Sequence, residues 1–194
     1  MLESKASLTF SESIKDAENL LSHFITLNPD KPPPETEVLK RAGLVMAMTA
    51  WETYVEDRLI ETALGKLKGV GDPHIAGYVK ARLIDEINRL HNPTSAKVIQ
   101  LFRDFCGVDL TDAWMWNQMD APSARKRLDD YIKLRGDVVH RSRKSLPGPT
   151  PPHPVNKDDL LKAIRFLKEL VHATDKALHA SKPAIEFDVD AIQQ

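Results

Sequence analysis

Apolar residues recur every three or four positions through most of this chain, in segments that prolines and glycines separate. This period is that of one face of an α-helix, whereas a half-buried β-strand alternates apolar and polar residues. No convincing alternating segment is present, and neither is an internal repeat of about 20–50 residues. The pattern therefore predicts an all-α fold, a bundle of four long helices with one or two short ones. The predicted helices cover about residues 11–27, 35–68, 74–90, 94–105, 122–141 and 157–180.

Several residues at the ends of these segments suit helix caps. Ser11 or Ser13 can cap the first predicted helix. Thr94 or Ser95 can cap the fourth, which Gly107 ends. The middle of the second helix is apolar almost all round, which is typical of a helix either buried centrally or shared with a second subunit.

Proline-rich stretches suggest how the chain is divided. Residues 1–34 hold an N-terminal helix and a proline-rich linker, which is part of the bundle or packed on it. Residues 35–180 form the main helical domain, and residues 181–194 are expected to be a flexible tail. Within the main domain, residues 147–154 contain five prolines and cannot form helix.

The composition excludes several classes of protein. The single cysteine, Cys106, allows no intrachain disulfide and no cysteine zinc site, which fits a reducing cytoplasm. The start of the chain does not resemble a signal peptide, and no apolar run approaches the roughly 20 residues of a membrane helix. Glycine-rich phosphate loops and H-E-x-x-H or G-x-S-x-G motifs are absent, and the seven histidines are scattered without a ligand pair that indicates a metal site. We therefore predict no metal, no cofactor and no membrane partner.

The most informative segment lies in the fifth predicted helix, over residues 128–141. At 100° per residue, its apolar side chains form one stripe, and Arg135 falls within about 5° of the centre of that stripe. The stripe comprises Leu128, Tyr131, Ile132, Val138 and Val139. An arginine cannot lose its proton, so a buried Arg135 needs an anionic partner or must reach a cleft. His140 lies about 140° further round an ideal helix. The side chains of Arg135 and His140 therefore converge only if Gly136 distorts the helix or the long Arg135 side chain bends around it.

Two interpretations of Arg135 stay open at this point. In the first, it forms a structural ion pair with Glu52 or Glu56 on the second helix, and His140 merely sits near a helix end. In the second, Arg135 binds a phosphate and His140 transfers a proton, next to the basic residues Arg141, Arg143 and Lys144. If Arg135 is locked onto an internal carboxylate and His140 faces bulk water, the phosphate-binding interpretation fails and the sequence predicts only a helical bundle.

In its motifs the sequence resembles HEPN domains, and among them the bacterial RiboL-PSP-HEPN group. The family motif is R-x4-6-H near the end of a late helix, and the run Arg135-Gly-Asp-Val-Val-His140 matches it. The flanking segments 50–56, 91–102 and 107–114 support the match, so that the likeness covers about residues 36–175. One departure is Gly136, where the family usually has a polar residue.

The resemblance implies a metal-independent endoribonuclease that cleaves single-stranded RNA through attack of the 2′-OH. Arg135 would hold the scissile phosphate and His140 would act as general acid or base, with Asp137 and Glu52 supporting or orienting them. Residues Arg141, Arg143 and Lys144 would bind RNA phosphates. The resemblance also implies a cytoplasmic homodimer in a toxin–antitoxin or other defence system, with an antitoxin or defence-system partner.

Other functions compete with this one. Because Gly136 replaces a polar residue, the chain can instead be a catalytically inactive HEPN module that binds RNA, nucleotide or a partner protein. In a third interpretation it is a helical adaptor whose apolar residues 44–50 form a dimer surface. Trp114 and Trp116 are expected to fill gaps in the bundle rather than stack on bases. Cys106 is expected to be a small core residue.

Overall fold

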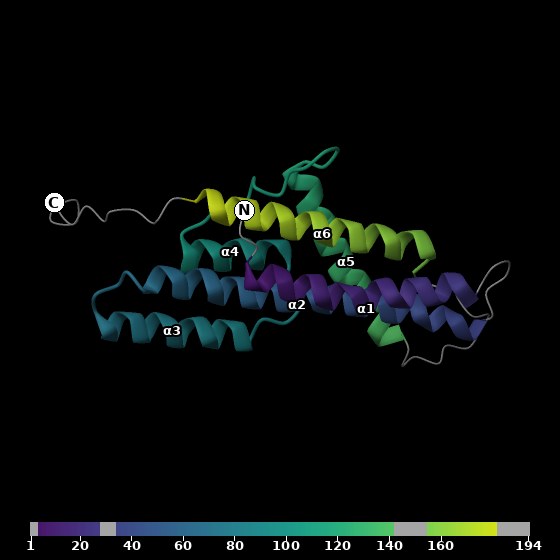
Figure 1. The fold of residues 1–194 in the computed structure, drawn as a ribbon, viewed down its shortest axis with the longest axis horizontal. Helices are drawn as coiled ribbons and strands as arrows, with labels where there is room; N and C mark the ends of the chain where they lie inside the picture. The colour runs from purple at the N-terminus through teal and green to yellow at the C-terminus, as the bar shows by residue number, and fades with distance from the viewer. Residues whose placement is uncertain (1–3, 28–33, 142–154, 182–194) are drawn as a thin grey trace.

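The computed structural model describes residues 4–27, 34–141 and 155–181. These residues form six α-helices and one short 3-10 helix, and within them the only β-type pairing is an isolated bridge between Trp116 and Met119. The predicted all-α fold is therefore confirmed. The elements are α1 (Lys5–Leu27), η1 (Pro34–Thr36), α2 (Glu37–Leu67), α3 (Pro73–Asn88), α4 (Ser95–Cys106), α5 (Ala121–Arg141) and α6 (Lys157–Ala180) (Figure 1).

Helix α2 is the centre of the bundle. It contacts α1, α3, α4, α5 and α6, and Figure 1 shows α1 and α6 running along it while α5 crosses behind them. Residues Leu44, Ala47, Met48 and Ala50 are all at most 2% exposed. Of the two alternatives for this helix, the structure therefore shows the central buried one. The third interpretation loses its dimer surface, because most of the apolar stretch 44–50 is already packed inside one chain.

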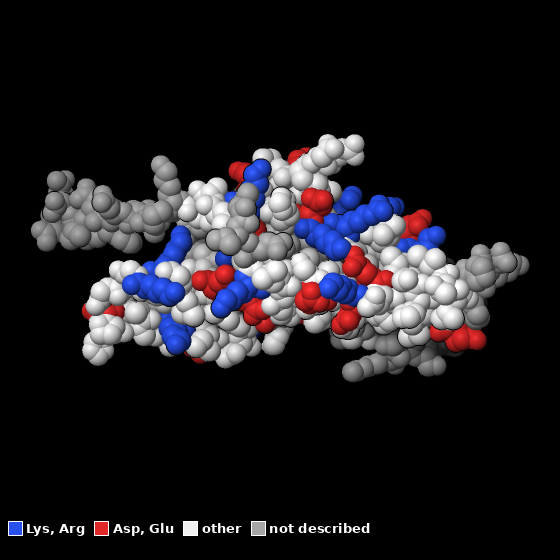
Figure 2. Space-filling view, in the orientation of Figure 1, with Lys and Arg blue, Asp and Glu red and all other residues white. Residues whose placement is uncertain are grey.

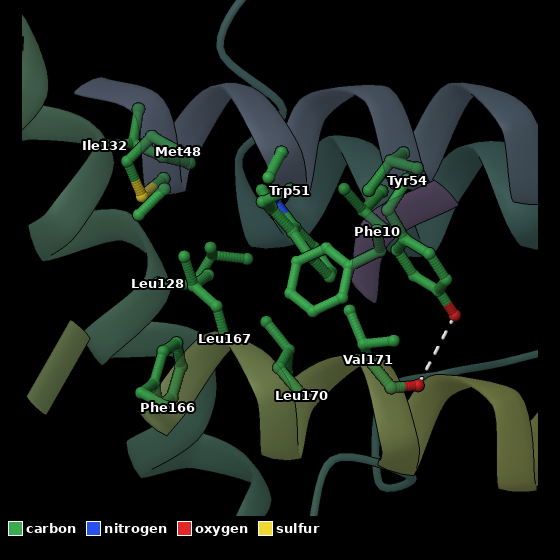
Figure 3. Close-up of a cluster of buried hydrophobic side chains, with 14 of the residues drawn as sticks. Phe10, Met48, Trp51, Tyr54, Leu128, Ile132, Phe166, Leu167, Leu170 and Val171 are labelled. Atoms are coloured by element: carbon green, nitrogen blue, oxygen red, sulfur yellow. Dashed lines mark hydrogen bonds between the residues drawn. The ribbon is translucent and has the colours of Figure 1, made fainter. Parts of the chain in front are cut away.

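The core is built around large side chains from four helices. Figure 3 shows Phe10 of α1 and Trp51 of α2 facing residues of α5 and α6, among them Leu128 and Leu167. Trp114, from the segment between α4 and α5, meets the Trp51 ring edge-on at 6.3 Å between centroids. Its indole Nε1 donates to Thr174 Oγ1 at 2.9 Å. The prediction that Trp114 fills a gap is therefore confirmed.

The start of α1 differs from the predicted one. The helix begins at Lys5, so that Ser11 and Ser13 lie inside it and cap nothing. Its free backbone N–H groups are satisfied from elsewhere: Ser4 Oγ accepts from the Ser7 N–H at 3.0 Å, and Glu61 of α2 accepts from Lys5 and Ala6. A carboxylate at a helix N-terminus also interacts favourably with the helix dipole.

A polar cluster, the Asp175 cluster, holds α1, α2 and α6 together. It comprises Ser4 and Ser7 at the start of α1, Tyr54 and Arg58 on α2, and Asp175 on α6. Arg58 Nε donates to Asp175 Oδ1 at 2.6 Å, and the Tyr54 hydroxyl donates to the same oxygen at 2.9 Å. Both serine hydroxyls donate to Asp175 Oδ2. Because these groups satisfy one another, the cluster can lie between three packed helices.

Helices α3 and α4 are short and differ in how they are held. Helix α4 has the two ends that the sequence predicted: Thr94 caps its start, and Gly107 ends it with φ of 61°. Six residues of α4 are buried. In α3, Leu83 is the one buried residue among those described. None of the helices in the described ranges has the length and apolarity that a membrane span requires.

Candidate functional site

Helix α5 fixes the position of Arg135. The helix is anchored to the core by Leu128, Ile132 and Val138, which are at most 9% exposed. The side chain of Arg135 lies at the rim of this buried face and is 23% exposed. Val139 was predicted in the same stripe but is 40% exposed, because the buried face of α5 is narrower than the stripe on an ideal helix. The rim position lets the guanidinium reach a neighbour while part of it faces outward.

The guanidinium of Arg135 belongs to a closed ring of three residues. Its Nη1 donates to Glu52 Oε2 at 3.2 Å and to Asn92 Oδ1 at 2.9 Å. The backbone N–H of Asn92 in turn donates to Glu52 Oε1 at 3.1 Å. Helix α2, helix α5 and the loop between α3 and α4 thus each supply one member of the ring. The ring fixes the orientation of the guanidinium, since two acceptors converge on one nitrogen.

Asn92 reaches this ring through an unusual backbone conformation. Its φ is 55°, in the left-handed region that asparagine tolerates better than most residues. The loop around it is anchored by Leu90 and Pro93, which are buried. At the following helix, the N–H and hydroxyl of Ser95 both donate to the Asp129 carboxylate of α5, each at 2.8 Å. The loop is therefore tied directly to the helix that carries Arg135.

Arg135 and its neighbours line a groove of about 340 Å³. The other lining residues are Glu52, His91, Asn92, Gly136 and Val139. A Cβ added at Gly136 would meet nothing within 4 Å, so the groove is open above this glycine. Within the described part of the chain, the polar contacts of Arg135 all use Nη1. A guanidinium also carries Nε–H and Nη2–H donors in a fork geometry that suits binding of a phosphate through two hydrogen bonds.

The carboxylates near the groove influence one another. Burial raises the pKa of Glu56 above its usual value, and the negative charges of Glu52 and Asp57 raise it further. The charge of His91 has the opposite and smaller effect and lowers the pKa of Glu56. Among the described residues, no group of three or more histidine, cysteine or acidic side chains is arranged to hold a metal ion.

The structure brings together only some of the residues predicted for the site. Arg135 and Glu52 are paired, as the first interpretation of Arg135 required, with Glu52 rather than Glu56 as the partner. Asp137 lies on α5 but does not line the groove. His140 and Arg141 lie in the last turn of α5, and their side chains, like Arg143 and Lys144, are outside the described residues. Of the two conditions that together would leave only a bundle, the one on Arg135 is met, because its guanidinium is paired with Glu52, and the one on His140 falls outside the described residues.

Two residues of the groove, His91 and Asn92, were given no role in the sequence analysis. The signal that could have found Asn92 is an asparagine followed by a proline and a helix cap, because asparagine suits left-handed turns. Away from the groove, Cys106 is 1% exposed, and burial raises the pKa of its thiol to about 12. It is a core residue, as predicted. Figure 2 shows lysines and arginines interleaved with acidic residues on the face formed by α1 and α6, so that this face carries no patch of one sign.

Comparison with known proteins gives one result. Searches of curated proteins and of solved structures found nothing that matches the chain. A protein family, RiboL-PSP-HEPN, matches residues 11–180, which include all of α2 to α6 and most of α1. The matched range also contains the groove and the Arg135–His140 motif. The chain therefore belongs to the RiboL-PSP-HEPN family.

Proposed function

We propose that this protein is a metal-independent endoribonuclease that cleaves single-stranded RNA through attack of a ribose 2′-OH. Membership of the HEPN superfamily supports a function in RNA or nucleotide chemistry. The observation that carries the proposal further is the state of Arg135, whose guanidinium is oriented by Glu52 and Asn92 at the edge of an open groove. An oriented cation of this kind stabilises the charge that develops on a phosphate during cleavage, without rearranging first.

The proposed reaction is an internal transesterification. A general base removes the proton of the 2′-OH, the 2′-oxygen forms a bond to phosphorus, and the bond from phosphorus to the 5′-oxygen breaks. The electron pair leaves with the 5′-oxygen, which takes a proton from a general acid. The products are a 2′,3′-cyclic phosphate and a 5′-OH. Arg135 would contact the phosphoryl oxygens, and His140 would carry one of the two protons, since an imidazole can exchange protons near neutral pH.

The remaining predicted residues have supporting roles in this proposal. Glu52 orients Arg135 through the ion pair that the structure contains. Asp137 would support His140 from the same helix, and Arg141, Arg143 and Lys144 would bind RNA phosphates on either side of the cleavage position. On the family resemblance alone, we extend the proposal to a cytoplasmic homodimer with an antitoxin or defence-system protein as partner.

A second candidate is a catalytically inactive module that binds RNA, nucleotide or a partner protein. Two observations favour it: Arg135 already has an internal carboxylate as its partner, and Gly136 offers no side chain where the family usually has a polar one. This candidate predicts that RNA binds to the purified chain and is not cleaved.

Incubation of the purified protein with single-stranded RNA in excess EDTA separates the two candidates. We expect cleavage that continues in EDTA and products that end in a 2′,3′-cyclic phosphate. A matched oligonucleotide with 2′-deoxyribose at the mapped cleavage position should remain intact, because it lacks the nucleophile. Binding of the RNA without product, or equal cleavage of the deoxy-substituted strand, would contradict the proposed chemistry.

Asn92→Gly should reduce kcat about 10–100-fold with a smaller effect on KM. Glycine keeps the left-handed backbone and the N–H that donates to Glu52, but removes the oxygen that accepts from Arg135. Losing a hydrogen bond to a charged group costs about 1.5–3 kcal/mol, which corresponds to that range. The measurement is steady-state cleavage kinetics together with thermal unfolding.

Gln118→Gly is the matched control, because Gln118 has φ of 63° and does not line the groove. It should cleave like the wild type. If both glycine variants lose the same activity, or if Asn92→Gly cleaves normally, then Asn92 does not position Arg135.

A further inference from the structure

Gly136 lies inside α5, where glycine is an unfavourable residue. A glycine in a helix interior loses more backbone freedom on folding than any other residue, and it makes the helix less stable than alanine would. Three features of a structure can require glycine at such a position. They are a left-handed backbone, a tight contact within the chain, and a close approach of a ligand to the backbone.

The backbone of Gly136 does not require glycine. Helix α5 continues without interruption through this position. Among the described glycines, Gly107 alone has a positive φ. Because the helical conformation is open to every L-residue except proline, the conformational freedom of glycine is not used at Gly136.

Gly43 on α2 shows a glycine that a contact within the chain requires. A Cβ placed there would lie 2.7 Å from Cδ2 of Leu160, so α2 and α6 approach closely because the side chain is missing. At Gly136, no group of the described chain comes within 4 Å of such a Cβ. Contacts between described residues therefore do not explain Gly136, and the close approach of a ligand is the remaining feature.

The surroundings of Gly136 suit a nucleotide. The groove that it lines, at about 340 Å³, lies within the range of about 300–1,000 Å³ that is typical of small-molecule pockets. The guanidinium of Arg135 is oriented in this groove by Glu52 and Asn92. Gly136 and Val139, which is 40% exposed, give the α5 side of the groove an apolar surface. A ligand with an anionic group and an uncharged body matches this division.

We propose that Gly136 is a ligand contact of this groove, at which the sugar next to the phosphate on Arg135 lies directly against the backbone of α5. The sugar is joined to its phosphate through one oxygen, so it must lie close to the guanidinium, and Gly136 leaves room for it beside Arg135. The inference rests on the proposed binding of an RNA phosphate by Arg135. It adds the residue that sets how closely the sugar approaches the helix.

The test is binding of a short single-stranded oligonucleotide with 2′-fluoro sugars, which has no 2′-OH to attack phosphorus. Gly136→Ala should raise its Kd about 10–100-fold, because a methyl group forced into a close contact is unfavourable by about this factor. The same variant should raise Tm by about 2–4 °C, because alanine is the better helix former. Weaker binding by a more stable protein separates the loss of a contact from damage to the fold. Fluorescence anisotropy and thermal unfolding measure the two effects.

Gly77→Ala is the matched control. Gly77 lies inside α3, is exposed, has no described group within 4 Å of an added Cβ and does not line the groove. This variant should gain stability in the same way and bind the oligonucleotide like the wild type. Gly136→Leu should bind more weakly than Gly136→Ala, because the larger side chain fills more of the space that the sugar needs.

Three results for Gly136→Ala would overturn the contact. The first is wild-type affinity, and the second is a lower Tm, which would show that another part of the chain packs on the glycine. The third is a changed oligomeric state in sedimentation, which would show that a second copy packs there. A wild type that binds the oligonucleotide but cleaves no RNA loses the ribonuclease function and keeps the contact, whereas a wild type that does not bind the oligonucleotide loses the contact.

Discussion

Arg135→Ala is expected to lower kcat/KM for RNA cleavage about 10³-fold. The variant loses the donors that would contact the phosphoryl oxygens, and an oriented arginine at a phosphate is typically worth about 10³-fold or more. It also leaves the carboxylate of Glu52 in the groove without its cation, so that the groove repels a phosphate. Arg135→Lys keeps the charge but not the planar fork, and should lose about 10²-fold. Steady-state kinetics with a short RNA measures both.

Lys133→Ala is the matched control for Arg135→Ala. Lys133 lies two residues earlier on α5, carries the same charge and is exposed. Its removal should change kcat/KM little, whereas a loss as large as that of Arg135→Ala would show that bulk charge on α5, not the oriented guanidinium, supports cleavage. Thermal unfolding of both variants checks that neither effect comes from loss of the fold.

Asp175→Ala is expected to lower the free energy of unfolding by about 3–5 kcal/mol. The side chains of Asp175 and Arg58 are 15% and 8% exposed, and removing Asp175 leaves the buried Arg58 with only the longer ion pair to Glu61, at 3.8 Å. The change should lower Tm by about 6–20 °C in a chain of this size. Urea unfolding followed by circular dichroism gives the free energy directly. Glu169→Ala, on an exposed position of the same helix, should stay within about 0.5 kcal/mol of the wild type.

The contribution of Asp175 should also depend on pH. Burial acts to raise the pKa of Asp175, but hydrogen bonds from Ser7 and Arg58 and the charge of Arg58 outweigh it, so that the pKa in the folded chain lies below its usual value. A lowered pKa stabilises the fold above the unfolded value of about 3.9, and this stability is lost as pH falls through the folded pKa. The difference in unfolding free energy between wild type and Asp175→Asn should therefore be full at neutral pH and shrink below about pH 4. A difference that stays constant into acid would show that the charge of Asp175 does not stabilise the fold.

The sequence predicted most of the helices because their ends depend on nearby residues. Thr94 and Gly107 bound α4 as expected, since a side-chain cap and a left-handed glycine act within one turn. The start of α1 could not be predicted in this way. Its caps include Glu61 of α2, which is distant in the sequence and reaches the helix only once the bundle has formed.

The same distinction applies to the groove. Arg135 stood out in the sequence because a cation in an apolar stripe requires a partner, and Glu52 was one of the two carboxylates considered. Asn92 did not stand out, because its role depends on a left-handed backbone and on contacts with two helices. Val139 was assigned to the buried stripe, yet it lines the groove, since only the packed chain decides where the buried face of α5 stops.

Helix α3, which precedes the loop of the groove, is less firmly packed than the other helices. Among the described residues of α3, Leu83 alone is buried, so detaching this helix costs a small part of the free energy of the whole fold. His91 follows α3 closely along the chain, whereas Asn92 is bonded to α2 and α5. Opening of α3 would therefore leave the guanidinium oriented, because the loop that holds it is anchored by the buried Leu90 and Pro93 and is bonded to α2 and α5. The orientation of Arg135 thus does not depend on the least buried helix of the bundle.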